Sequence, residues 1–296
     1  MLGRIINVSI ALFALSSMAA FAHQPVPTAT PAKEVDRAGV PKPLPFEPEE
    51  ELVYEGEFSK LLLRGINIAE FKFRVERGTA EASARPGASP APANLVFKGD
   101  VTAHGWFRKL FGIDFHYNTE TVVASDSLLI LSNSVRDEQG KRLRTSQSIF
   151  DRTQNLLTWT QRNPNDPQAE PRVVRAPLQN AAHDLISAIY FLRTQPLEPG
   201  RTFELNISDS GAVYRIPVRV GARKRMKTIV GRVQTVRVDV DIFGAERLVD
   251  RKGEMTLWIT DDASRLPVRA RVNTDIGTLD ITLKKISAPN APGKSR

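Results

Sequence analysis

The strongest constraint on the fold is an alternation of apolar and polar residues with a period of two. In the clearest run, Val236, Val238 and Val240 alternate with Arg237 and Asp239. Comparable runs occur at 71–76, 214–220, 266–273 and 279–284. Such alternation places one face of a strand in a core and the other in water, and sheets of this kind are normally antiparallel. Sequences rich in Gly, Asp, Asn and Pro separate the runs and predict turns.

One segment departs from this alternation. Residues 181–193 read AAHDLISAIYFLR, with Asn180 as a candidate N-cap, Asp184 in the first turn and Arg193 in the last. These positions favour a helix. Apolar residues cover most of its circumference, which is typical of a buried helix. We therefore expect a mainly β protein, with a curved antiparallel sheet, barrel-like or half-open, wrapped around one long buried helix near 181–193.

The first 22 residues have the three parts of a secretory signal peptide. Arg4 supplies positive charge, an apolar run extends from Ile5 to Phe21, and Ala20-Phe21-Ala22 is a small-x-small cleavage site. The run is short for a transmembrane helix, and no later segment is long and apolar enough to be one. We expect cleavage after Ala22 and a periplasmic or secreted protein that does not span the membrane.

Composition divides the remaining chain into one domain and three low-complexity segments. Prolines crowd residues 23–48 and predict a disordered arm, because proline cannot join a helix interior or a central strand. A patch rich in Ala, Pro, Ser and Gly at 78–93 predicts a loop within the domain. Residues 288–296 read as a disordered tail. A single β-rich domain is expected at 49–287.

Composition also excludes several classes of function. The chain contains no cysteine, which removes disulfides, thiol catalysis, iron–sulfur clusters and cysteine-ligated zinc. Its formal charge is +8, which in a cytosolic protein would point to nucleic acid. Export argues against that partner. It favours a lipid, an anionic glycan or a protein of the cell envelope, and no cofactor is expected.

An aromatic and basic cluster is the first candidate for ligand binding. Its rings could contact an acyl chain while the neighbouring cations bind a head group. Packing in the core is the alternative. The candidate residues are Trp106, Phe107, Arg108, Lys109, Phe111, Phe115 and Tyr117.

Five arginines on the polar sides of predicted strands are the second candidate. If these strands are neighbours, the arginines form a basic face that could bind phosphates or carboxylates. A solvated sheet face that discourages aggregation is the alternative. The five are Arg215, Arg219, Arg237, Arg269 and Arg271.

The histidines do not predict a metal site. His104 and His116 could meet across a turn and bind a metal with Asp114 or Glu120. That spacing is not diagnostic, and a structural role is the preferred interpretation.

His183, Asp184 and Ser187 do not predict a catalytic triad. Adjacent helical residues point in different directions, so His183 and Asp184 would not orient each other. The sequence also contains no Gly-x-Ser-x-Gly motif. We expect Asp184 to place a charge at the start of the helix and to be hydrogen-bonded with Ser187.

Asp261 and Asp262 are adjacent carboxylates that could contact calcium. Two such groups supply too few oxygen ligands, and the spacing of an EF-hand is absent. A tight turn with Arg265 paired to one of them is the preferred interpretation. No catalytic residue and no metal site are therefore predicted.

A series of short motifs occurs in a fixed order along the chain. The motifs are Pro45-Phe46, Glu51-Leu52-Val53-Tyr54, the run Asp184 to Arg193, Leu197-Glu198-Pro199-Gly200, Leu257 to Asp262, Arg265-Leu266-Pro267-Val268 and Ile276-Gly277. This order resembles a bacterial family known as domain-of-unknown-function family 3108, over roughly Pro45 to Ile286. The resemblance implies an exported, mostly β protein without established activity, so no site residue carries over. The loop at 78–93 looks like an insertion, and His183 is not part of the pattern.

These patterns predict an exported, non-enzymatic protein whose curved sheet binds an apolar or amphipathic, lipid-like ligand at its mouth. A protein-interaction or scaffold module in envelope assembly is the first alternative, which a filled barrel with an exposed apolar patch would favour. A hydrolase with a histidine–carboxylate site is the second. Convergence of those groups in a cleft would favour it.

Overall fold

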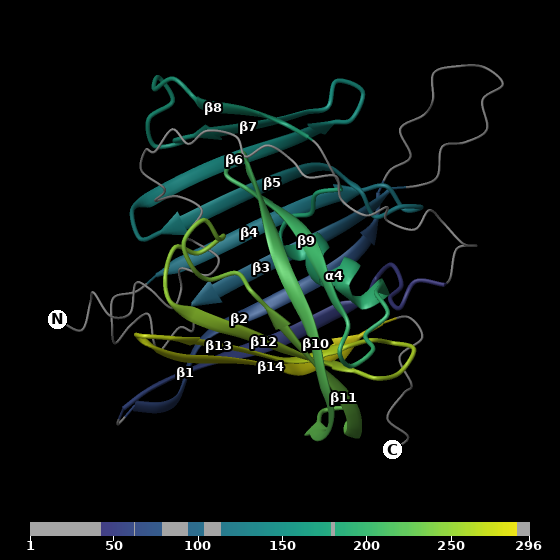
Figure 1. Cartoon of the computed structure of the whole chain (residues 1–296). Helices are drawn as coiled ribbons and strands as arrows, with labels where there is room; N and C mark the ends of the chain where they lie inside the picture. The colour runs from purple at the N-terminus through teal and green to yellow at the C-terminus, as the bar shows by residue number, and fades with distance from the viewer. Residues whose placement is uncertain (1–42, 62, 79–93, 104–113, 179–180, 289–296) are drawn as a thin grey trace.

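The computed structural model describes residues 43–61, 63–78, 94–103, 114–178 and 181–288. The predicted signal peptide lies outside these residues, as do most of the predicted arm, loop and tail. Within the described residues the chain forms one antiparallel sheet of fourteen strands and one short helix (Figure 1).

Each of the five alternating runs of the sequence overlaps a strand of the sheet. Burial alternates residue by residue along β3, as expected for a strand with one buried face. The elements are β1 (Glu51–Lys60), β2 (Leu63–Arg77), β3 (Leu95–Ala103), β4 (Phe115–Val123), β5 (Ile130–Gln139), β6 (Arg142–Asp151), β7 (Leu156–Arg162), β8 (Arg172–Pro177), α4 (Leu185–Thr194), β9 (Thr202–Asp209), β10 (Ala212–Thr228), β11 (Gly231–Val240), β12 (Gly253–Thr260), β13 (Pro267–Thr274) and β14 (Gly277–Ser287).

The strand order is a meander in which the first and last strands pair. It runs β8-β7-β6-β5-β4-β3-β2-β1-β14-β13-β12-β11-β10-β9. Strands β1 and β14 are neighbours, with Glu51 opposite Ser287, so the two ends of the domain lie together in the sheet. Strands β8 and β9 are the sheet edges, and the sheet is not closed. The predicted curved, half-open antiparallel sheet is therefore confirmed in outline.

The helix is shorter than predicted and starts later. Its N-cap is Asp184, and α4 has 10 residues. The backbone N–H of His183 donates to Asn206 (2.8 Å), and the backbone N–H of Ser208 donates to His183 (2.7 Å). Hydrogen bonds to β9 therefore replace the expected first helical turn. The prediction of one long buried helix near 181–193, capped by Asn180, is wrong for this reason.

Helix α4 lies inside the curve of the sheet, where it contacts β3, β4 and β9. It lies very close to Gly99 of β3, where an added Cβ would lie 2.0 Å from Cδ1 of Ile186. The ring of Tyr190 stacks on Phe97 with 4.3 Å between centroids. Glycine at position 99 thus lets the helix sit directly on the sheet.

The last residues of the predicted arm belong to the folded domain. Phe46 is 5% exposed and packs edge-on against Tyr190, with 4.9 Å between ring centroids. The boundary predicted at residue 48 is therefore corrected, because burial of this aromatic side chain is strongly favourable. The fold includes the chain from residue 43 onward among the described residues.

Candidate functional site

A groove opens between the inner faces of β4 to β7, the start of α4 and the turn after β9. Its empty volume is about 670 Å³, which includes open solvent at the mouth. Gly211 in the β9–β10 turn lies so close to Val174 that an added Cβ would be 2.8 Å from that side chain. This turn therefore brings β9 and β10 against the strands of the opposite edge.

The lining of the groove is mainly polar, although it faces the interior of the sheet. Asn133, Asp137, Arg144, Ser146 and Gln161 line it together with further hydroxyl and carboxylate side chains. A large ring, that of Trp159, also lines it, and the guanidinium of Arg172 lies 5.5 Å from the centroid of that ring. The groove thus combines an indole with many hydrogen-bonding groups.

Asp184 at the groove has a structural role. Its carboxylate accepts hydrogen bonds from Nδ2 of Asn133 (2.7 Å), from the hydroxyl of Thr121 and from the backbone N–H of Ser187 (2.7 Å). The hydroxyl of Ser187 accepts from the backbone N–H of Asp184 (2.9 Å). This reciprocal pair is a capping box. The predicted structural interpretation of Asp184 and Ser187 is confirmed.

Asp137 is a buried carboxylate at the groove wall. Burial raises its pKa, and this effect exceeds the opposing effects of Arg142 and Gln139. Arg142 forms an ion pair with Asp137, and Nε2 of Gln139 donates to it (3.1 Å). The carboxylate is thus already held by two neighbours.

Of the two described members of the predicted aromatic cluster, Tyr117 lines the groove. Burial raises the pKa of its phenol, and the nearby carboxylates of Asp209, Asp184 and Asp137 raise it further. The side chain is therefore a neutral phenol at any ordinary pH. Cations accompany these three carboxylates, since Arg144 lines the groove and Arg142 is paired with Asp137.

The rest of the aromatic cluster does not form a described binding site. Phe115 is 7% exposed and belongs to the hydrophobic core. The remaining residues of the hypothesis lie outside the described residues. They are Trp106, Phe107, Arg108, Lys109 and Phe111.

The five predicted arginines lie on the sheet, but acids accompany most of them. Arg215 pairs with Glu204 (2.8 Å) and Arg237 with Asp239 (2.9 Å). Arg269 and Arg271 share Asp280 (2.7 and 2.9 Å). Within the described residues, Arg219 alone of the five has no ion pair. Neighbouring carboxylates thus neutralise most of the positive charge of the basic face that the alternation predicted.

The histidines do not come together with a carboxylate in the groove. Nε2 of His116 lies 2.6 Å from Asp100 on a partly exposed face. His183 is 2% exposed and stacks on Phe191 with 4.3 Å between ring centroids. His104 lies outside the described residues. In the described part of the chain, no group of three or more His, Asp or Glu is arranged to hold a metal.

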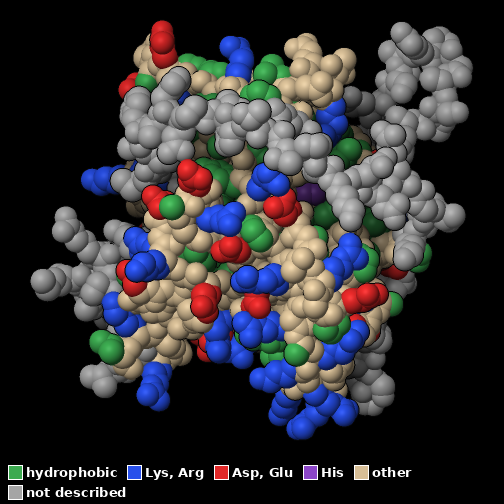
Figure 2. Space-filling model, in the orientation of Figure 1, with side chains coloured by type: hydrophobic (Ala, Val, Ile, Leu, Met, Phe, Trp, Pro, Cys, Tyr) green, Lys and Arg blue, Asp and Glu red, His purple; other side chains and the backbone are tan. Residues whose placement is uncertain are grey.

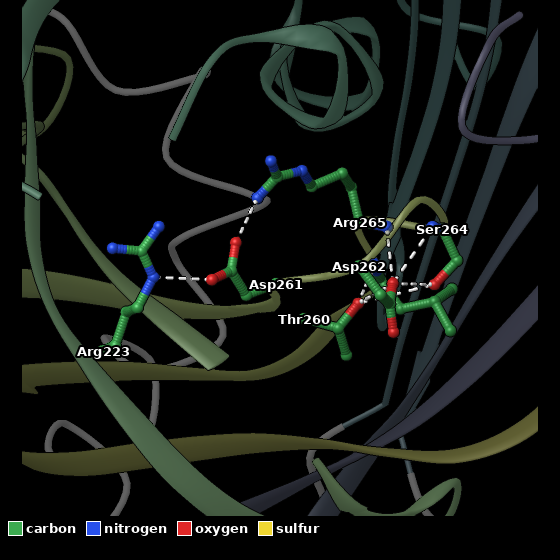
Figure 3. Close-up of polar contacts among 7 residues, drawn as sticks. Arg223, Thr260, Asp261, Asp262, Ser264 and Arg265 are labelled. Atoms are coloured by element: carbon green, nitrogen blue, oxygen red, sulfur yellow. Dashed lines mark hydrogen bonds and ion pairs between the residues drawn. The ribbon is translucent and has the colours of Figure 1, made fainter. Parts of the chain in front are cut away.

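Asp261 and Asp262 form a hydrogen-bonded turn after β12 (Figure 3). Asp262 accepts from the hydroxyl of Thr260 (2.8 Å) and from the backbone N–H of Ser264 (3.0 Å). Asp261 accepts from Nη1 of Arg265 (3.0 Å) and from Nε of Arg223 (2.6 Å). The predicted tight turn with Arg265 as a partner is confirmed.

Sequence reasoning missed most of the groove. One sequence feature could have indicated it. In β4 to β7, polar residues occupy inward positions at which the alternation predicts apolar side chains. Thr119 and Asn133 are both buried there. Ser146, Trp159 and Gln161 also face inward, at positions that share a face with buried neighbours. Polar residues on the buried face of adjacent strands predict either a network or a site.

Comparison with known proteins identifies a family and a shared fold, and it indicates no activity. A family model described as "Protein of unknown function (DUF3108)" matches residues 54–284. No curated protein matches significantly. A β-barrel-like protein of a domain of unknown function, DUF1849, from Brucella abortus has 8% identity and a TM-score of 0.52 over 82% of this chain and 98% of that chain. At this identity the likeness shows a shared fold alone.

Two further solved structures are less similar. A candidate exported protein with a YmcC-like fold from Bacteroides fragilis has 11% identity and a TM-score of 0.33, over 83% of this chain and 98% of that chain. A candidate lipoprotein from Parabacteroides distasonis has 9% identity and a TM-score of 0.31, over 82% of this chain and 98% of that chain. In the described part of this chain, no helix has the length and hydropathy needed to cross a membrane.

Proposed function

The chain belongs to the DUF3108 family of proteins of unknown function, and from that premise we propose that it is an exported, non-catalytic protein that binds a small, uncharged, hydroxyl-rich ligand in its inner groove. The signal sequence at residues 1–22 supports export and a periplasmic or secreted location. The observation that carries the proposal is the mainly polar lining of the groove. Within the described residues, the side chains of Gln161 and Ser146 line it and make no hydrogen bond.

The chemistry of the lining favours a sugar ring or another polyol. Hydroxyl groups can both donate and accept, which suits an amide such as Gln161 beside hydroxyl and carboxylate neighbours. Trp159 is 4% exposed and has the guanidinium of Arg172 5.5 Å from its ring centroid, so the indole supports the wall of the groove and offers little free ring face. An acyl chain would leave these polar groups without partners, which costs free energy. The lipid-like ligand expected from the sequence therefore fits this groove poorly.

Two of the three groove carboxylates, Asp184 and Asp137, support a non-catalytic role. Asp184 caps α4, and Asp137 is paired with Arg142. Both of these carboxylates thus have partners that belong to the fold. Formation of a product from any bound sugar would contradict this part of the proposal.

Native mass spectrometry of the protein purified from periplasm would show which molecule is bound. Calorimetric titration with glucose, N-acetylglucosamine and glycerol would then measure affinity. We expect Gln161→Ala to weaken binding of the preferred probe about fivefold, because one hydrogen bond is lost. Gln147→Ala is the matched control, since Gln147 is an exposed residue that alternates with Ser146 along β6.

Two results would contradict the proposal. A lipid of defined mass that remains bound through purification would favour the amphipathic ligand expected from the sequence. An equal loss of affinity in the Gln161→Ala and Gln147→Ala variants would mean that the probe does not bind in the groove. Either result would leave the β fold and the family membership unchanged.

A further inference from the structure

The β10–β11 hairpin extends beyond both of its neighbours in the sheet. Pairing of β10 with β9 ends at Arg219, opposite Thr202. Pairing of β11 with β12 begins at Thr235, opposite Thr260. From Arg223 to the turn, β10 pairs in the described sheet with β11 alone, and β11 pairs with β10 alone from Gly231 to Val233. Figure 1 shows this hairpin projecting from the lower end of the molecule.

The projecting hairpin is strongly basic. Lys224, Arg225, Lys227 and Arg232 are all exposed, and none of them has an ion pair within the described residues. The sequence contains no Asp or Glu from 210 to 238. Figure 2 shows Lys and Arg side chains gathered at the lower end, where the hairpin projects. This contrasts with the body of the sheet, where acids accompany most of the arginines.

The tip of the same hairpin is apolar. The turn runs from Thr228 to Gly231, and its two central residues, Ile229 and Val230, are each 42% exposed. The left-handed position of this turn is filled by Gly231 (φ 102°), so Ile229 and Val230 need no strained backbone. Their apolar side chains are exposed to water, and burial of such side chains in an apolar environment is favourable.

We propose that this hairpin, whose apolar tip is flanked by four unpaired cations, docks the protein on an anionic lipid bilayer. Ile229 and Val230 enter the boundary between head groups and acyl chains, and the four cations lie among the lipid phosphates. Anionic surfaces attract such basic segments, and buried apolar area adds to the attraction. A soluble polyanion would satisfy the cations but would not require the apolar tip. This proposal does not depend on a ligand in the groove.

Co-sedimentation with vesicles tests the proposal directly. The exported chain from His23 to Arg296 is mixed with vesicles of phosphatidylethanolamine and phosphatidylglycerol, and separately with neutral phosphatidylcholine vesicles. We expect binding to the anionic vesicles only. We also expect binding to decrease strongly as salt approaches about 1 M, where the screening length falls to about 3 Å.

A quadruple variant and a double variant separate the contributions of the cations and of the apolar tip to vesicle binding. Changing Lys224, Arg225, Lys227 and Arg232 together to Gln should weaken vesicle binding more than 100-fold, at roughly fivefold per cation. The Ile229→Ser/Val230→Ser double variant should weaken it about tenfold through lost apolar burial. Circular dichroism and the thermal midpoint should stay unchanged, because the hairpin tip makes no contact with the core.

Matched controls come from exposed positions elsewhere in the domain. Changing the exposed cations Arg64, Arg162, Arg175 and Lys252 to Gln removes the same charge. The Ile149→Ser/Val173→Ser double variant removes two apolar side chains of similar exposure, 43% and 45%. Both controls should bind vesicles within about twofold of wild type.

Three outcomes would overturn the proposal. Equal losses in the control and hairpin charge variants would assign binding to net charge alone. Full vesicle binding by the Ile229→Ser/Val230→Ser variant, with equal binding to soluble dextran sulfate, would identify a polyanion site in place of a membrane site. Absence of binding to anionic vesicles by the wild-type protein at low salt would exclude membrane docking.

Discussion

At the scale of single residues, the buried side chain of His183 makes the stability of the fold depend on pH. Its ring stacks on Phe191, and its Nδ1 atom has no partner within the described residues. Burial lowers the pKa of His183 to about 4, with a further contribution from the nearby charge of Arg152. The folded protein therefore holds this ring neutral across the physiological range.

This predicts a loss of stability on mild acidification. The folded pKa lies below the ordinary histidine pKa of 6.5, so the stabilisation is fully present above about pH 6.5 and decreases as pH falls toward 4. We expect wild type to lose about 2 kcal/mol between pH 7 and pH 5 through His183. Denaturant titrations of wild type and His183→Phe at both pH values would measure this difference.

The variant should lack that part of the pH dependence, because phenylalanine cannot take up a proton. If His183→Phe loses as much stability as wild type over the same interval, other groups cause the loss. The neutral, buried state of His183 would then have no role in acid sensitivity.

At the scale of elements, the position of α4 depends on a glycine and a capping residue. Gly99 of β3 lets Ile186 contact the sheet, and Asp184 ties the start of the helix to β4 and β5 through Thr121 and Asn133. The apolar pattern of the helix was evident in the sequence, but its start was not. A polar network on the sheet fixed Asp184 as the N-cap.

Gly99→Ala should therefore destabilise the protein. The added methyl group would lie 2.0 Å from Cδ1 of Ile186, and overpacking of this kind costs about 1–3 kcal/mol. Chemical denaturation would measure the loss. Adding Ile186→Val removes the clashing methyl group, so we expect the double variant to recover part of it. Additive losses in the double variant would mean that helix and strand do not meet at Gly99.

At the scale of the whole molecule, Arg193 joins three regions that are distant in the sequence. Its guanidinium donates to Glu50 (2.5 and 3.0 Å), to the backbone oxygen of Pro45 (2.7 Å) and to that of Ser264 (3.0 Å). The side chain is fully buried. The helix, the segment before β1 and the turn after β12 are thus held by one cation.

Arg193→Met should destabilise the protein by about 3–5 kcal/mol, because Glu50 would remain buried without its partner. The double variant Arg193→Met/Glu50→Met removes both charges and should be clearly more stable than the single variant. Denaturant titration at neutral pH would compare them. Equal stability of the single and double variants would mean that the buried carboxylate contributes little to the loss.

The groove shows why sequence patterns predicted some features of this protein and missed others. Trp159 and Gln161 alternate along β7 like any half-buried strand, and nothing in that pattern says which residues of β4 to β6 face them. The strand order brings Asn133, Asp137 and Arg144 beside them. The alternation of a strand indicates which of its residues point inward. It does not indicate which residues of other strands lie beside them, and a binding site depends on those neighbours.

The sequence by itself determined the β class, the antiparallel pairing, the buried character of residues 185–193 and the turn at Asp261-Asp262, because each depends on local periodicity or on neighbours within a few residues. Tertiary structure alone decided the pairing of β1 with β14, the start of α4 at Asp184, the burial of Phe46 and the composition of the groove. These features arise from contacts between segments far apart in the chain, whose free energy depends on the register and curvature of the whole sheet.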